Sequence, residues 1–153
     1  MCLKTVDSEK ETKELLLSKK NNYMYVWKVV KPLYSTKQYY PVYDNLTFEE
    51  GENIARDSDS VGLTPITKYK PGFHSFLRKK DALDYQKYIN IPRSKPIRFR
   101  RIMSKLIRCK VKKSWVTCTG TSNTKWDYVI KPDSVPARTI VSNKIIIPKY
   151  KKD

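Results

Sequence analysis

Apolar and basic residues alternate along residues 107–112, and this pattern is the clearest candidate for chemistry in the chain. The basic members are Arg108, Lys110 and Lys112. A period of two places them on one side of an extended strand, about 6.6 Å from one to the next. That spacing is close to the spacing of phosphates along a nucleic-acid strand, so the row can follow a backbone. Trp115 is expected on the same face, where it either stacks on a base or pairs with Lys112 on a solvated surface.

Basic residues also dominate the sequence around this row. Residues 85–126 contain twelve lysines and arginines and no acid, and the whole chain carries a net charge of +17. Because like charges repel one another on a folded surface, such a block favours a polyanionic partner. The alternatives are solubility charge in a lysine-rich proteome and, for residues 93–101, a localisation signal. The expected binding residues are Arg93, Lys95, Arg98, Arg100, Arg101, Lys105, Arg108, Lys110, Lys112, Lys113 and Trp115.

The other reactive residue types do not form a recognisable catalytic set. The single histidine, His74, is not accompanied by a G-x-S-x-G nucleophile motif, and no glycine-rich phosphate loop occurs. A structural hydrogen-bonding role is the simpler interpretation of His74. Three cysteines make no even disulfide framework, and with one histidine they cannot complete a zinc set at normal spacing. We therefore expect a protein that is not an enzyme and that holds no cofactor and no metal.

A β-hairpin is expected to position the basic row. A reversal within residues 113–114, or a four-residue loop in the same register, pairs Val111 with Val116. It also sets Cys109 opposite Cys118, as two buried thiols or, alternatively, as a disulfide.

Further elements are expected from patterns elsewhere in the chain. Aromatic and β-branched residues on both faces of residues 23–30 indicate a central strand that Pro32 ends. Shorter strands are expected at residues 72–76, 128–130 and 140–148. Helices are expected after the capping box that Ser8 begins, over Thr47–Arg56, and over Asp81–Ile89 with Asp81 as cap.

These elements predict an α+β fold built on a mostly antiparallel sheet with one or two short helices. The expected organisation is a helical or flexible extension over residues 1–22, a single domain over 23–148 and a basic tail over 149–153. No secretory signal and no apolar run of membrane-spanning length occurs. We therefore expect no membrane partner and an intracellular location, in the cytoplasm or nucleus of a host or packaged in a virion.

Several fragments resemble a run in ADP-ribosyltransferase-like domains and in small phage and viral proteins of unknown function. The matching fragments are Gly62–Pro65, Gly72–Phe76, Asp81–Tyr85 and Asp127–Pro132. The resemblance covers about residues 61–145 and implies a degenerate form of that fold. Such transferases use an acidic residue on a late strand, whereas this chain has no glutamate after Glu52. The resemblance therefore implies the fold without the activity.

Together these features predict a basic, non-enzymatic protein that binds DNA or RNA through phosphate contacts with little sequence specificity. One alternative is a viral or phage interaction protein, a virion component or an inhibitor of a host factor, whose basic face binds an acidic protein surface. The other is a divergent ADP-ribosyltransferase-like enzyme.

Overall fold

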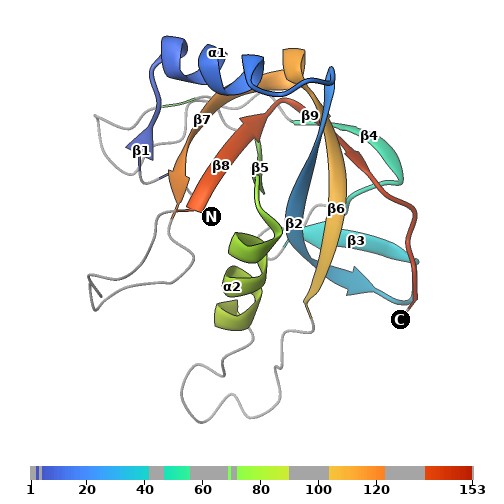
Figure 1. Ribbon diagram of the computed structural model, residues 1–153. Helices are drawn as coiled ribbons and strands as arrows, with labels where there is room; N and C mark the ends of the chain where they lie inside the picture. The colour runs from blue at the N-terminus through green and yellow to red at the C-terminus, as the bar shows by residue number, and fades with distance from the viewer. Residues whose placement is uncertain are drawn as a thin grey trace.

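The computed structural model describes residues 3, 5–41, 47–55, 69, 72–89, 104–122 and 137–152. Within them the chain forms two α-helices and nine strands, and every described strand pair is antiparallel (Figure 1). The prediction of a mostly antiparallel α+β fold is therefore confirmed, with strands far outweighing helices. The elements are β1 (Thr5–Val6), α1 (Glu9–Leu17), β2 (Tyr23–Leu33), β3 (Gln38–Pro41), β4 (Gly51–Ile54), β5 (Phe73–Phe76), α2 (Lys79–Ile89), β6 (Lys105–Lys112), the 3-10 turn η1 (Lys113–Trp115), β7 (Val116–Ser122), β8 (Ala137–Ser142) and β9 (Lys144–Ile147).

The strands join in the order β1-β7-β8-β5-β2-β6-β9-β4, with β3 paired to the end of β2. Strand β2 is the longest and lies at the centre, as the sequence predicts. It pairs with β6 along Tyr23–Val30, with β5 at Trp27, and with β3 along Val30–Leu33. The prediction that Pro32 ends the strand is wrong, because Pro32 lies opposite Tyr39 in a hairpin with β3 and the strand runs on to Leu33.

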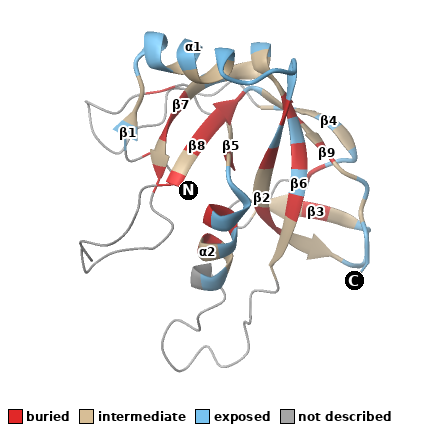
Figure 2. Ribbon diagram, viewed as in Figure 1, coloured by how far each residue is buried: buried red, intermediate tan, exposed pale blue. Residues whose placement is uncertain are grey.

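The two faces of the β2–β6 ladder border different parts of the molecule. One face turns toward the main core, where the most deeply buried members from this ladder are Val26, Val30 and Val111. The other face is covered at one end by α2, whose Ala82 and Tyr85 pack with Val29 of β2 (Figure 2). Aliphatic and aromatic side chains at alternate positions therefore hold the ladder rigidly from both sides.

Helix α1 confirms its predicted start. Glu11 donates its backbone N–H to the Ser8 hydroxyl at 3.2 Å, and Ser8 Oγ donates to the Glu11 carboxylate at 3.0 Å. The segment is tied to the sheet, because Asp7 accepts hydrogen bonds from Thr119 at 2.6 Å and from Arg138 at 2.9 Å. Residues 5–17 are thus fastened to the edge that β7 and β8 form.

Two helix predictions need correction. Helix α2 begins at Lys79, and Asp81 lies within its first turn, where it accepts two hydrogen bonds from Arg78 at 2.8 and 3.0 Å. The prediction of a helix over Thr47–Arg56 is wrong. Its middle is strand β4, which begins at Gly51 with a φ of 93° and pairs with the isoleucine-rich β9. A positive φ breaks a helix, and a Thr–Glu capping pattern does not outweigh it.

Candidate nucleic-acid interface on the β2–β6 face

Strand β6 alternates as predicted, but it does not form the predicted hairpin. Ile107, Cys109 and Val111 are buried, while Arg108 and Lys110 are exposed. The hairpin prediction is wrong because β6 pairs with β2 and β9, whereas β7 pairs with β1 and β8. The turn η1 carries the chain from one part of the sheet to the other. The apolar side of β6 gains Met24 and Val26 as cross-strand partners, which a threonine-rich β7 cannot match.

The two cysteines therefore do not face each other. Cys109 lies opposite Val26, and Cys118 lies opposite Val141, both as free thiols. Burial raises the pKa of Cys109 to about 12 and that of Cys118 to about 11. Both thiols therefore stay protonated at neutral pH.

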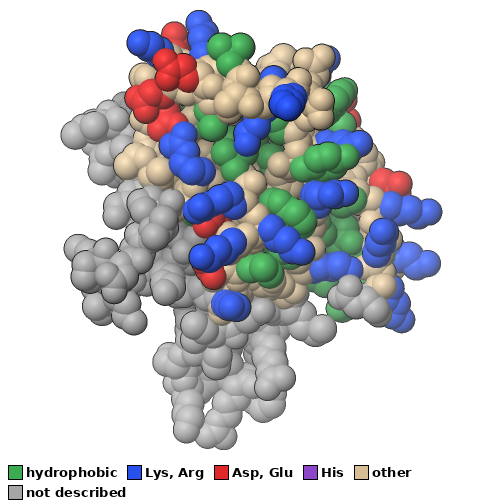
Figure 3. Space-filling view, in the orientation of Figure 1, with side chains coloured by type: hydrophobic (Ala, Val, Ile, Leu, Met, Phe, Trp, Pro, Cys, Tyr) green, Lys and Arg blue, Asp and Glu red, His purple; other side chains and the backbone are tan. Residues whose placement is uncertain are grey.

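The exposed and half-buried side chains on the outer side of β2 and β6 form one surface, which we call the β2–β6 face. Its members are Tyr23, Tyr25 and Trp27 of β2 and Arg108, Lys110 and Lys112 of β6. In the register of the ladder each aromatic residue lies directly opposite one cation. Figure 3 shows basic and hydrophobic side chains interleaved over this part of the molecule, with several acids near α1 and a few others lower down and at the right edge.

The cations of this face contact rings. The Arg108 guanidinium lies 4.3 Å from the centre of the Tyr25 ring, and Lys110 Nζ lies 5.5 Å from it. At the α2 end, Lys79 Nζ lies 5.3 Å from the Trp27 ring. The ion pairs between described residues lie elsewhere and join Arg78 to Asp81, Arg138 to Asp7 and Lys144 to Glu52. The charge of the β6 row is thus not cancelled by any acid in the described parts of the chain.

Other predicted binding residues lie off this face. Lys105 belongs to the opposite side of β6, where it bonds the carbonyl of Lys151 and lies 6.0 Å from the Tyr39 ring. Lys113 lies in η1 and donates to the carbonyl of Lys19. Trp115, also in η1, meets Tyr23 edge-on at 6.1 Å and has Lys144 as its cationic neighbour at 5.9 Å. The predictions for Arg93, Lys95, Arg98, Arg100 and Arg101 concern positions outside the described residues.

The three aromatic residues of the face were not predicted from the sequence as binding residues. Tyr23, Tyr25 and Trp27 recur with a period of two, which is a signal that a single strand offers. Whether these rings lie beside cations depends on which strand is their neighbour. Residues 23–30 pair with a segment about 80 positions away. A local pattern does not specify such a partner.

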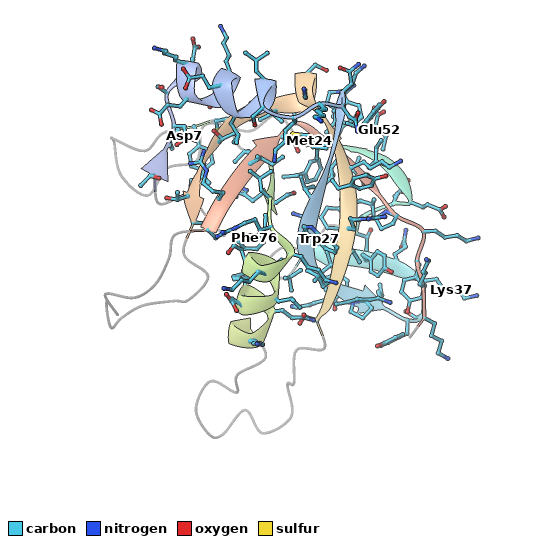
Figure 4. All side chains as sticks on the ribbon, viewed as in Figure 1. Asp7, Met24, Trp27, Lys37, Glu52 and Phe76 are labelled. Atoms are coloured by element: carbon cyan, nitrogen blue, oxygen red, sulfur yellow. The ribbon has the colours of Figure 1, made fainter. Side chains whose placement is uncertain are left out.

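A shallow hollow of about 210 Å³ adjoins the face where β2 separates from β5. The two strands pair only at Trp27 and Phe76, which Figure 4 shows beside α2. Toward the start of β2 the hollow is lined by Tyr23, Tyr25, Met24 and Leu77, with Lys19, Lys20 and Asn21 of the α1–β2 turn around them. The hollow is thus bordered by aromatic and aliphatic residues and by two lysines.

His74 and Lys28 lie on the interior side and have structural roles. His74 Nδ1 lies 3.2 Å from the Gly72 carbonyl, which can only accept, so the neutral ring carries its proton there. Nε2 then accepts from the Tyr69 hydroxyl at 2.9 Å. Burial and the nearby charge of Lys28 lower the pKa of His74 to about 4. A neutral, doubly bonded ring fits the structural interpretation of this residue.

Lys28 is the one basic residue within Tyr23–Val30 of β2. Its side chain points toward the core side of the ladder. Its ammonium group donates to the carbonyl of His74 and lies 5.7 Å from the Phe48 ring. Burial lowers the pKa of Lys28 to about 8, because the charged form loses solvation there.

The fragment that resembles ADP-ribosyltransferase-like domains also has structural explanations at its described positions. A Cβ at Gly72 would lie 2.5 Å from the Ser142 carbonyl, so only glycine fits against β8. Phe76 is almost fully buried and Ala82 fully so. Comparison with known proteins gives no match to a family model, a curated protein or a solved structure, so the resemblance stays a prediction.

Two further observations concern only the described residues. Neither of their helices is long and apolar enough to cross a membrane. Their histidine, cysteine and acidic side chains do not gather into a group of three that could hold a metal ion.

Proposed function

We propose that the β2–β6 face binds nucleic acid through phosphate contacts with little sequence specificity and without catalysis. The observation that carries this proposal is the alignment of Arg108, Lys110 and Lys112 on one exposed side of a strand that is backed by a packed core. No acid of the described residues pairs with them. Contacts to phosphate release condensed counterions and relieve the repulsion within the row.

The rigidity of β6 supports the same proposal. β6 is hydrogen-bonded to β2 over its full length and contacts β9 at Lys110. The side chains on its outer side therefore keep a spacing of about 6.6 Å, set by the strand. A row fixed in advance loses less conformational entropy on binding than the same lysines and arginines on a flexible segment.

The test is the salt dependence of binding to duplex and single-stranded oligonucleotides, with heparin as a general polyanion. Three phosphate contacts give a slope of log K against log salt of about −2.7 for duplex DNA, and further contacts make it steeper. Arg108→Gln, Lys110→Gln and Lys112→Gln should each reduce that slope by about 0.9. Lys13→Gln, on the exposed side of α1, removes the same charge away from the face and is the matched control. Equal effects of all four changes would overturn the proposal.

An acidic protein surface is a second candidate partner, favoured by the tyrosines among the cations. Tyrosine and arginine are enriched in protein interfaces, and ring–cation contacts are available to a protein as well as to a base. Capture from cell extract with and without nuclease treatment separates the two. A partner that survives nuclease and is lost with Arg108→Gln would support the protein surface instead.

A further inference from the structure

Two half-exposed tyrosine rings lie in succession on the β2–β6 face. Tyr23 is 45% exposed and Tyr25 is 52% exposed, although both belong to the central strand of the sheet. Large aromatic side chains at the centre of a sheet are usually covered, as Trp27 partly is by α2. The rings stand on one side of the strand at the spacing of about 6.6 Å that separates alternate residues.

The Tyr25 ring is positioned where a planar ligand can contact it. The guanidinium of Arg108 lies 4.3 Å from its ring centre, at the distance of stacked groups. Lys110 Nζ also lies 5.5 Å from the ring centre, and with both cations in place 52% of the residue remains exposed. The exposed part of the ring and the neighbouring guanidinium are both groups on which a planar ligand can stack.

The hollow beside Tyr25 is equally well fixed. Lys113 holds both ends of the α1–β2 turn that contains Lys19, Lys20 and Asn21. The backbone N–H of Lys113 donates to the Asn22 carbonyl at 2.8 Å, and its ammonium group donates to the Lys19 carbonyl. The hollow is shallow and has a volume of about 210 Å³, which suits a group the size of one phosphate better than a whole nucleotide.

We propose that the β2–β6 face selects single-stranded nucleic acid, with one base stacked on Tyr25 and the phosphate of the neighbouring nucleotide placed in the hollow at Lys19 and Lys20. This proposal rests on the proposed function and adds the strandedness of the ligand to it. The phosphates that follow meet Lys110 and Arg108 along β6.

The strandedness follows from what each nucleic acid exposes. A duplex hides the flat faces of its bases in the stack and presents phosphates and groove edges. An unpaired strand presents both phosphates and base faces, so it alone can use the rings and the cations together. Stacking on an aromatic side chain tolerates every base, which agrees with little sequence specificity.

The first experiment compares an unpaired oligonucleotide of about 12 nucleotides, as DNA and as RNA, with the matching duplex by fluorescence anisotropy. We expect the unpaired strands to bind at least about fivefold more tightly than the duplex at equal salt. Tyr25→Leu should weaken unpaired strands by about fivefold or more, while Tyr25→Phe keeps the ring and the affinity. Tyr34, 50% exposed in the turn between β2 and β3, gives the matched control Tyr34→Leu, which should change neither.

The second experiment tests the hollow. Lys19→Gln and Lys20→Gln should each reduce the slope of log K against log salt for the unpaired strand by about 0.7, whereas Lys13→Gln leaves the slope unchanged. Melting of each variant verifies that the exposed substitutions leave the fold intact. Equal slopes for all three variants would remove the hollow from the binding path.

Failure of this inference is distinguishable from failure of the proposed function. If unpaired strand and duplex bind equally and Tyr25→Leu binds both as the parent does, phosphate binding stands and strand selection is refuted. If neither nucleic acid shows a salt slope that depends on Arg108 and Lys110, the proposed function itself fails.

Discussion

The two faces of the β2–β6 ladder place basic residues in opposite environments, one buried and one exposed to solvent. On the inner face, Lys28 lies against Phe48 and the His74 carbonyl, and burial lowers its pKa to about 8. On the outer face, Arg108 and Lys110 lie over an exposed tyrosine ring in contact with solvent. One strand pair thus holds a cation whose charge weakens the fold and cations whose charge is available to a ligand. The difference shows that strand alternation, more than net charge, decides which cations are open to solvent.

The sharpest way to break this comparison is to place another cation in the fully buried part of the inner face. Val111 is fully buried in the main core, so Val111→Lys buries an ammonium group without a partner. We expect a loss of about 4 kcal/mol or more in the free energy of unfolding, measured by urea denaturation. Lys110→Val, the next residue on the outer face, should change that free energy by less than about 0.5 kcal/mol. Similar losses in the two variants would contradict the separation of the faces.

Acid should weaken the interior side through His74. Its pKa is about 4 in the folded protein and 6.5 in a free chain, so the unfolded chain takes up the proton first as the pH falls. Stability is therefore lost between pH 6.5 and 4, by about 3 kcal/mol for this shift. His74→Gln keeps a donor for the Gly72 carbonyl and an acceptor for the Tyr69 hydroxyl and does not titrate. The loss should appear as the difference between parent and variant in urea denaturation at each pH, and parallel curves would contradict it.

Removing the inner cation should strengthen the fold. At pH 7 Lys28 is charged in both states, and the folded state bears a cost of about 3 kcal/mol for a pKa lowered from 10.5 to about 8. Lys28→Met removes this cost and loses one hydrogen bond to the His74 carbonyl, worth about 1 kcal/mol. We expect the free energy of unfolding to rise by about 2 kcal/mol at pH 7.

The same substitution has a pH signature. Between pH 8 and 10.5 the folded lysine has lost its proton while the unfolded lysine keeps it, so the parent gains stability as the pH rises. The gain should be missing in Lys28→Met. Cys109 has a raised pKa and acts with the opposite sign above pH 9, so the quantity to compare is the difference between the two proteins. Nucleic-acid binding by Lys28→Met should equal that of the parent, and a loss of binding would place this lysine in the interface.

Local patterns predicted the elements of this fold well. The period of two at residues 107–112 depends only on which side of one strand faces the core. The structure shows the same alternation of buried and outward-facing side chains. The Ser8 capping box and the strand at residues 72–76 likewise depend on neighbours a few positions apart. Residues 140–148 were predicted as one strand, but they form the end of β8 and the whole of β9, with a break at Asn143. The prediction missed the break because no change in the apolar pattern marks it.

Pairing between distant segments could not be predicted in the same way. The hairpin at residues 107–118 fits its own sequence, with cation beside polar residue and cysteine beside cysteine. The choice of β2 as the neighbour of β6 depends on Met24 and Val26, which are more than 80 positions away. The candidate site forms only through that choice, because it joins the rings of one strand to the cations of the other. The basic row of β6 was therefore predictable, and the complete candidate face was not.

The smallest expected effect separates ring contact from charge on the outer face. Arg108→Lys keeps the positive charge and loses the flat guanidinium over Tyr25. We expect an unchanged salt slope, an unfolding free energy within about 0.5 kcal/mol of the parent, and roughly two- to fivefold weaker binding of unpaired strands. Lys110→Arg is the reverse control and should bind at least as tightly as the parent, because it brings a second planar group to the same ring. If Arg108→Lys binds unpaired strands as the parent does, the guanidinium contributes only charge, and the stacking surface reduces to the Tyr25 ring alone.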